Sequence, residues 1–294
     1  MSEINVNDVA LIFEGGGTRA ANTAGVVNTL LNNGIYFKDV FGISAGSSHT
    51  INYISRDAVR ACASFVEYMG LPQVGGKKFF FTGKGYFNSH YIYQESGKPE
   101  GALPFNFTAF MESSSEMHID GYEVDTDSTA HWTKEDIHEL QDLLNRVQAS
   151  SSMPFFMPIT RFGGHLYYDG GLGDSWGVQL DEAIACGYRK FFVVCTQEKG
   201  YRKKPPSHPL LSRMAVCRKY PQVAERMNAR WQFYNELYDR LDALEASGEA
   251  IVYHPRNMPI DNTCRDVETL QRLYEEGYTQ ANEELPRWKD FLGL

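Results

Sequence analysis

The sequence predicts an α/β fold of three layers, α/β/α, in which a mostly parallel central sheet lies between two layers of helices. The run Val9–Phe13 is continuously apolar and ends at Gly15-Gly16-Gly17, as expected of a buried parallel strand. A second strand over residues 37–43 is followed at once by a helix that begins near Ser44. Because strand and helix alternate in this way, we expect right-handed βαβ units.

The remaining elements are assigned from the same patterns of apolar periodicity and turn residues. We expect loops, short helices and one or two edge strands over residues 70–130, and a last central strand over 191–196. Between these points we expect helices over 18–33, 134–149 and 178–187, and a short strand over 166–168. After a linker at 200–209, we expect residues 208–294 to form a mainly helical C-terminal region. It should contain a helix over 221–246, a short strand over 251–254 and a final helical pair. Residues 8–200 are expected to form one domain, and the C-terminal region is expected either to pack on it or to follow it.

Composition narrows the classes of protein that fit. The chain has 294 residues, of which 43 % are hydrophobic, and a formal net charge of −9. That charge argues against a nucleic-acid partner. The five cysteines form no CxxC motif, and the N-terminus has neither a basic patch nor an apolar segment typical of a secretory signal. We therefore expect a cytoplasmic protein that meets lipid, if at all, by transient contact with a membrane surface.

The segment Gly42-Ile43-Ser44-Ala45-Gly46 has the form G-x-S-x-G and falls between a predicted strand and a predicted helix. A serine on such a tight turn exposes its hydroxyl at the end of a sheet, and Gly42 and Gly46 keep side chains away from it. The following helix directs free N–H groups toward the same point. Ser44 is therefore a candidate nucleophile.

The segment Gly15-Gly16-Gly17-Thr18-Arg19-Ala20 predicts a nest of backbone amides that binds an anion, either a phosphate or a tetrahedral oxyanion. It also fits the G-x-G-x-x-G/A fingerprint of dinucleotide-binding folds, which requires an acidic residue at the end of the second strand. Asp39 comes too early for that role, and Ser44 ends the strand instead. We therefore favour the oxyanion interpretation over nucleotide binding.

Asp169 precedes Gly170 and Gly171 at the end of a short predicted strand. A turn aspartate is common in this context, but a serine nucleophile also needs a proton acceptor, and partial desolvation would make Asp169 a better base. None of the eight histidines lies in a recognisable triad context, and no HExxH or comparable metal-ligand spacing occurs. We expect no metal and no cofactor.

In their order, these motifs resemble those of the patatin-like phospholipases, in particular the bacterial members. The resemblance spans roughly residues 8–200 and includes the serine-rich stretch 149–154 ahead of Asp169; Ala20 stands where many members have glycine. It implies a Ser44–Asp169 dyad, with Gly170 and Gly171 as motif glycines. It also implies an oxyanion site formed by the amides of Gly15, Gly16, Gly17 and Ala45, with Arg19 either stiffening the loop or contacting substrate phosphate.

The expected function is therefore that of a serine acyl hydrolase, a carboxylic ester hydrolase that acts on lipid or small ester substrates. A nucleotide-binding module and a catalytically silent lipid-binding protein of the same fold are the alternatives. The phenylalanines at 79–81, 105, 107 and 110 suggest either core residues or an acyl-chain lid.

Overall fold

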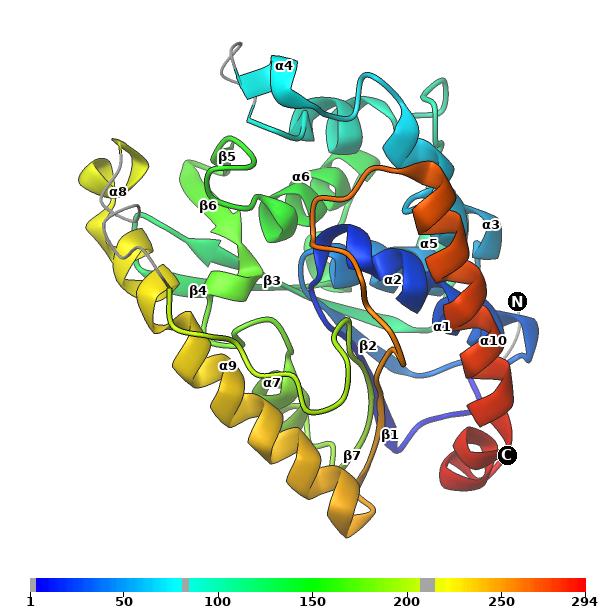
Figure 1. The fold of residues 1–294 in the computed structure, drawn as a ribbon. Coiled ribbons are helices and arrows are strands. Elements are labelled where there is room, and N and C mark those ends of the chain that lie inside the picture. Colours follow the sequence, from blue (N-terminus) through cyan, green and yellow to red (C-terminus); the bar gives the residue numbers. More distant parts are fainter. Residues whose placement is uncertain (1–3, 81–84, 207–214) are drawn as a thin grey trace.

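The computed structural model describes residues 4–80, 85–206 and 215–294, which fold around one eight-stranded sheet (Figure 1). The strand order is β5-β6-β3-β2-β1-β7-β8, and β4 pairs with β3 beside this path. Strands β3, β2, β1, β7 and β8 run parallel, whereas β4 and β6 are antiparallel to β3, and β5 is antiparallel to β6. The expected mostly parallel sheet is confirmed.

The strands and helices have the following bounds. The strands are β1 (Val9–Phe13), β2 (Asp39–Gly42), β3 (Glu116–Glu123), β4 (Ser128–Thr133), β5 (Thr160–Phe162), β6 (His165–Asp169), β7 (Lys190–Val194) and β8 (Ala250–Tyr253). The α-helices are α1 (Ala20–Asn32), α2 (Ala45–Ile54), α3 (Ala58–Ala63), α4 (Lys77–Phe80), α5 (Phe107–Glu112), α6 (Leu140–Ser151), α7 (Leu180–Ala185), α8 (Ala215–Lys219), α9 (Pro221–Ser247) and α10 (Val267–Leu292). Short 3₁₀ turns occupy Gly17–Arg19, Glu67–Gly70, Lys134–Asp136 and Gly170–Leu172, and a π-helical turn occupies His90–Glu95.

Both faces of the sheet are buried, which explains the continuous apolar run of β1. Val9, Leu11 and Phe13 belong to one core, and Ala10 and Ile12 belong to another on the opposite face. Helices α1, α2, α6 and α10 contribute side chains to the first core, and α7 and α9 contribute to the second. The three-layer arrangement is therefore confirmed.

Strand β3 corrects the expectation of loops and edge strands over residues 70–130. It lies beside β2 in the sheet and pairs with β2, β4 and β6. The segment has no apolar run because β3 buries two polar side chains, His118 and Asp120, among its apolar ones. His118 is bonded to Asp39 and Asp120 to His131, so that these polar groups are buried with partners from distant segments.

Two helices differ from their expected form. The helix expected over 134–149 is shorter: a capping box formed by Thr133 and Asp136 opens only a 3₁₀ turn, and a second box formed by Glu139 and Asp142 precedes α6. The final helical pair is a single helix, α10, which continues through Pro286. Trp288 and Leu292, beyond that proline, are buried in the core, and we attribute the continuity of the helix to this packing.

The C-terminal region shares the sheet of the N-terminal region. Strand β8 extends the sheet by pairing in parallel with β7, while α9 and α10 lie on opposite faces (Figure 1).

The phenylalanines suggested as either core residues or an acyl-chain lid have different positions in the structure. Phe105 and Phe110 are buried core residues, Phe107 packs against them, and residue 81 lies outside the described residues.

Candidate active site

Ser44 lies in the tight turn between β2 and α2. Its backbone has φ 56° and ψ −125°, a left-handed conformation that is costly for a residue other than glycine. The flanking glycines permit close packing, because a Cβ atom at Gly46 would lie 2.2 Å from the Phe13 carbonyl oxygen and one at Gly42 would lie 2.3 Å from the Gly46 carbonyl oxygen. The G-x-S-x-G pattern therefore reflects a real steric requirement.

The register of the sheet brings Asp169 to the same place. Gly42 of β2 pairs with Ile119 of β3, and two residues farther along these strands come Ser44 and Gly121. Gly121 in turn pairs with Asp169, the last residue of β6. Two residues that are 125 positions apart in the sequence thus meet across β3.

The side chains of Ser44 and Asp169 lie close enough to interact, and the Ser44 hydroxyl lowers the pKa of the Asp169 carboxyl group. The Asp169 carboxylate also accepts a hydrogen bond from the Gly171 amide at 2.8 Å. Both residues are buried, with exposed fractions of 6 % for Ser44 and 8 % for Asp169. Burial raises the pKa of Asp169 above its ordinary value, and these interactions and the charge of Arg230 oppose that shift. The carboxylate is therefore more basic than an aspartate in water.

The serine-rich stretch at the C-terminal end of α6 bonds to the backbones of both residues. The Ser150 hydroxyl oxygen accepts a hydrogen bond from the Ser44 amide at 2.9 Å. The Ser152 carbonyl accepts one from the Asp169 amide, also at 2.9 Å. One short segment therefore holds the backbones of the two residues at a fixed separation.

The glycine loop after β1 borders the same space. The Gly15 amide donates to the Gly177 carbonyl at 3.1 Å, so it is already engaged. Gly17 has φ +57°, and a Cβ atom there would lie 2.3 Å from the Asn262 carbonyl oxygen. Within the described residues, the amides of Gly16, Gly17 and Ala45 have no hydrogen-bond partner. Such free amides can bind an oxyanion.

Two cavities meet at Ser44. The larger has a volume of about 240 Å³, and its wall includes Asp169 and the glycine loop. The smaller, of about 40 Å³, is mostly apolar and is lined by Phe65, Phe87 and Met157, among others. The two cavities share Gly17, Ser44, Met153 and Asn262.

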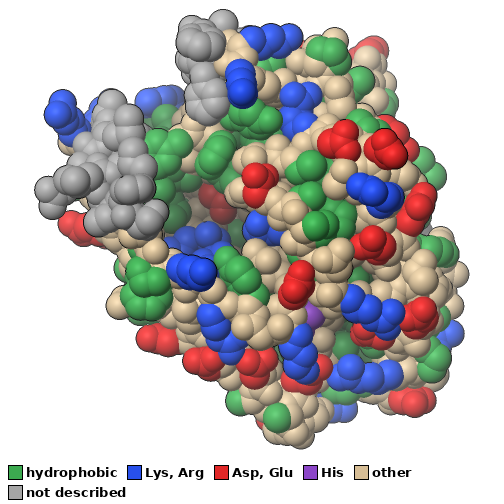
Figure 2. Space-filling model, in the orientation of Figure 1, with side chains coloured by type: hydrophobic (Ala, Val, Ile, Leu, Met, Phe, Trp, Pro, Cys, Tyr) green, Lys and Arg blue, Asp and Glu red, His purple; other side chains and the backbone are tan. Residues whose placement is uncertain are grey.

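Three cationic side chains line the larger cavity. They are Arg19, Lys203 and Arg230. Figure 2 shows a hollow in this face of the molecule with Lys and Arg side chains, in blue, along its wall. Sequence reasoning identified only Arg19, because Lys203 lies in the expected linker and Arg230 on a charged helix, and neither belongs to a motif.

None of the described histidines lines either cavity. The buried His49, on α2, is bonded through Nε2 to the Thr23 hydroxyl at 3.0 Å and to the Ala20 carbonyl at 3.1 Å. Burial lowers the pKa of His49 to about 4, so it stays neutral and serves the packing of α2. This observation favours a dyad without histidine.

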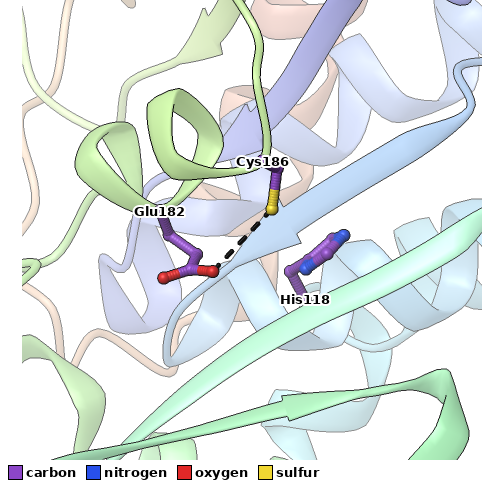
Figure 3. A group of neighbouring side chains, drawn as sticks. All are labelled: His118, Glu182 and Cys186. Carbon is purple, nitrogen blue, oxygen red and sulfur yellow. Dashed lines mark hydrogen bonds between the residues drawn. The ribbon is translucent and has the colours of Figure 1, made fainter.

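A group of side chains that could bind a metal ion lies away from the two cavities, on β3, on α7 and at the residue that follows α7. Ligand atoms of His118, Glu182 and Cys186 lie within 4.8 Å of one another (Figure 3). His118 Nε2 is already bonded to Asp39 at 2.8 Å, and burial, with the charge of Glu182, raises the pKa of Cys186 to about 11. A protonated thiol and an occupied imidazole nitrogen do not favour a metal ion. The absence of a metal remains a prediction.

Comparison with known proteins identifies the family. Residues 11–181 match the model of the patatin-like phospholipases, so the chain belongs to this family of lipid acyl hydrolases. Residues 220–293 match a domain of unknown function, DUF6363. Of the solved structures, VipD from Legionella pneumophila is similar over 97 % of this chain and 68 % of its own, with a TM-score of 0.52 and 12 % identity, which is a likeness of fold. No curated protein sequence matches the chain. No helix in the described ranges is both long and apolar enough to span a bilayer.

Proposed function

We propose that the chain hydrolyses acyl esters of lipids, as a phospholipase A, lysophospholipase or esterase, through a dyad of Ser44 and Asp169. The observation that carries this proposal is that Ser44, on its strained turn, and the buried Asp169 carboxylate line the same cavity and interact there. A buried carboxylate with a raised pKa is a competent general base. The strained turn holds the nucleophile toward this cavity.

The reaction follows the two steps of acyl transfer. Asp169 accepts the proton of the Ser44 hydroxyl as Oγ attacks the ester carbonyl, and the amides of Gly16, Gly17 and Ala45 hold the oxyanion. Asp169 then gives the proton to the leaving alcohol. In the second step, Asp169 takes a proton from water, the resulting hydroxide attacks the acyl-serine, and the proton returns to Ser44 Oγ. We assign no oxyanion role to the Gly15 amide, because the Gly177 carbonyl occupies it.

The smaller cavity suits the acyl chain. It is apolar, it reaches Ser44, and methionines line part of it. Methionine side chains adapt their shape readily, so the cavity can widen around a chain. The leaving group then faces the larger cavity, which three cationic side chains line.

Labelling with a fluorophosphonate probe, together with turnover of short p-nitrophenyl esters, tests this function. The parent chain should be labelled, and Ser44→Ala should abolish both labelling and turnover. Asp169→Asn should lower kcat by roughly 10²-fold or more, since a positioned base contributes about 10²–10⁴-fold. The acid limb of kcat/KM should lie above the ordinary range of an aspartate, because burial raises the pKa of Asp169.

His49→Gln serves as the control for a histidine base, with an expected loss of turnover far below that of Asp169→Asn. Undiminished turnover by Ser44→Ala would contradict the assignment of the nucleophile. A loss in any histidine variant as large as that of Asp169→Asn would replace the dyad with a triad.

A further inference from the structure

We propose that the larger cavity is a subsite for an anionic substituent of the substrate, a phosphate monoester or diester, and that Lys203 and Arg230 build it together with Arg19. This inference rests on the proposed hydrolase function. It goes further because Lys203 and Arg230 lie outside the range that matches the family, and Arg230 lies in the domain of unknown function. The C-terminal region would then determine which leaving group the enzyme accepts.

Three separate segments deliver the cations to one cavity. Arg19 ends the 3₁₀ turn of the glycine loop, Lys203 follows β7, and Arg230 lies on α9. All three line the cavity that also contains Ser44 and Asp169. This convergence is notable in a chain whose formal net charge is −9.

The charged ends of these side chains are unpaired. Within the described ranges, neither the Arg19 guanidinium nor the Lys203 ammonium forms a hydrogen bond or ion pair with protein, and Arg19 Nε is buried without a partner. Elsewhere on α9, by contrast, Arg226 pairs with Asp127 and Asp174, and Arg240 pairs with Asp181. Unpaired cations in a concave site attract an anionic ligand.

Lys203 is held in place without its charge being neutralised. Its amide donates to the Asn235 side chain at 2.8 Å, and its carbonyl accepts from the same side chain at 3.0 Å. Its ammonium lies 3.8 Å from the centroid of the Tyr234 ring. These contacts fix the position of the ammonium but leave its N–H groups available.

Arg230 is similarly oriented. Its Nε donates to the Gly171 carbonyl at 2.7 Å, and no described group accepts a hydrogen bond from its two terminal nitrogens. A guanidinium anchored at Nε presents its remaining donors in a fixed direction, which suits a phosphate. The site therefore combines an anchored guanidinium with an anchored ammonium.

The nearby carboxylates offset this charge only in part. The charge of Glu14 favours the protonated form of Lys203, and the charge of Arg19 lowers the pKa of Asp261, but neither carboxylate forms an ion pair with these cations within the described residues. Glu14 accepts from the Thr196 amide, the Thr196 hydroxyl and the Tyr234 hydroxyl. Asp169 accepts a hydrogen bond from the Gly171 amide, and of the three cations Arg230 is the one that lowers its pKa. Burial, with the nearby charge of Arg230, lowers the pKa of Lys203 to about 7, and a bound anion would favour its protonated form.

A pair of esters that differ only in charge tests the inference, for example octanoyl-glycerol phosphate and octanoyl-glycerol. We expect the parent chain to hydrolyse the phosphate ester with a kcat/KM at least about tenfold higher. Lys203→Gln should lower the kcat/KM of the phosphate ester by roughly 10- to 100-fold through KM, the loss expected for a charge-assisted hydrogen bond, and should lower that of octanoyl-glycerol by a much smaller factor. Lys203→Arg should restore most of the preference. Lys204→Gln, at an exposed neighbouring position, should not affect either substrate.

Binding to the Ser44→Ala protein, measured by calorimetry, separates this inference from the proposed function. Tight binding of octanoyl-glycerol phosphate that Lys203→Gln and Arg230→Lys weaken would support the subsite even if no ester were hydrolysed. Inorganic phosphate should compete with the phosphate ester for this cavity, and a failure to compete at any concentration would contradict the subsite. Equal kcat/KM for the two esters, or equal losses on both in Lys203→Gln, would overturn the inference while leaving the hydrolase function intact.

Discussion

At the scale of single residues, the site combines strain with desolvation. Ser44 occupies a left-handed backbone conformation, which costs of order 1–3 kcal/mol in a residue with a side chain. The Asp169 carboxylate is buried and has lost most of its contact with water. Neither the strain nor the desolvation stabilises the folded protein, and both suit the proposed roles of nucleophile and base. Such local costs are typical of functional sites.

Replacing the buried carboxylate should therefore stabilise the protein. The pKa of Asp169 is raised in the folded chain, so the stability present with the protonated acid is lost as pH rises through that folded value. Asp169→Asn keeps an acceptor for the Gly171 amide without the charge. We expect its Tm at pH 7 to exceed that of the parent by roughly 2–4 °C, and the difference to vanish as pH falls below the ordinary pKa of an aspartate.

Calorimetric scans at several pH values would check this expectation. Asp8→Asn is a suitable control, because the side chain of Asp8 is 70 % exposed and its contact with Lys190 spans 3.6 Å. Its Tm should change little at any pH. A lower Tm for Asp169→Asn than for the parent at pH 7 would show that the charged carboxylate is a net stabilising group.

The residues of the site differ in how far the sequence predicts them. The positions of Ser44 and the glycine loop follow from local pattern, since each lies between an apolar strand and a helix. Lys203 and Arg230 carry no local signal, because their role depends on where β7 and α9 lie relative to β2. Long-range placement of this kind is decided by tertiary packing, and a motif search cannot detect it.

At the scale of elements, β3 shows why part of the sheet is hidden from the sequence. Periodicity identifies strands by their apolar residues, but β3 buries His118 and Asp120, and the partners that satisfy them come from β2 and β4. The segment looks polar until those partners are known. It is nevertheless the strand across which Ser44 and Asp169 meet, through Gly121.

The apolar cavity beside α2 should set the preferred acyl length. It has a volume of about 40 Å³, and Met157, with an exposed fraction of 7 %, closes part of it. Met157→Ala removes three side-chain heavy atoms. We expect the optimum of kcat/KM over a series of p-nitrophenyl esters to move by roughly three carbons toward longer chains, with a stability cost of about 2 kcal/mol or more.

Met111→Ala provides the matched control, because Met111 is 38 % exposed on α5 and does not line the cavity. Its chain-length profile should coincide with that of the parent. If Met157→Ala kept the parental optimum while remaining folded by circular dichroism, the acyl chain would have to follow another route from Ser44.

At the scale of the whole molecule, the two matched ranges share one sheet and its two cores. Strand β8 continues the sheet, and α9 covers the face opposite α1. On the other face, α10 packs along α1, the helix that follows the glycine loop. The domain of unknown function is thus part of the same fold: both of its long helices pack on the cores, and α9 also contributes Arg230 to the wall of the candidate site.

The crossing of α1 and α10 gives the last prediction. A Cβ atom at Gly277 would lie 2.0 Å from the Asn22 carbonyl oxygen, and one at Gly25 would lie 2.2 Å from the Tyr278 amide nitrogen, so the two backbones meet without side chains between them. Gly277→Ala must push the helices apart, and we expect it to lower the free energy of unfolding by about 1–3 kcal/mol. Because the sheet and cores are shared, calorimetry should still record a single transition at a lower Tm. Glu276→Ala, at the exposed neighbouring position, should leave Tm nearly unchanged. Equal effects of the two substitutions would mean that α10 adjusts freely on α1, and separate transitions for the two ranges would contradict the expected single transition.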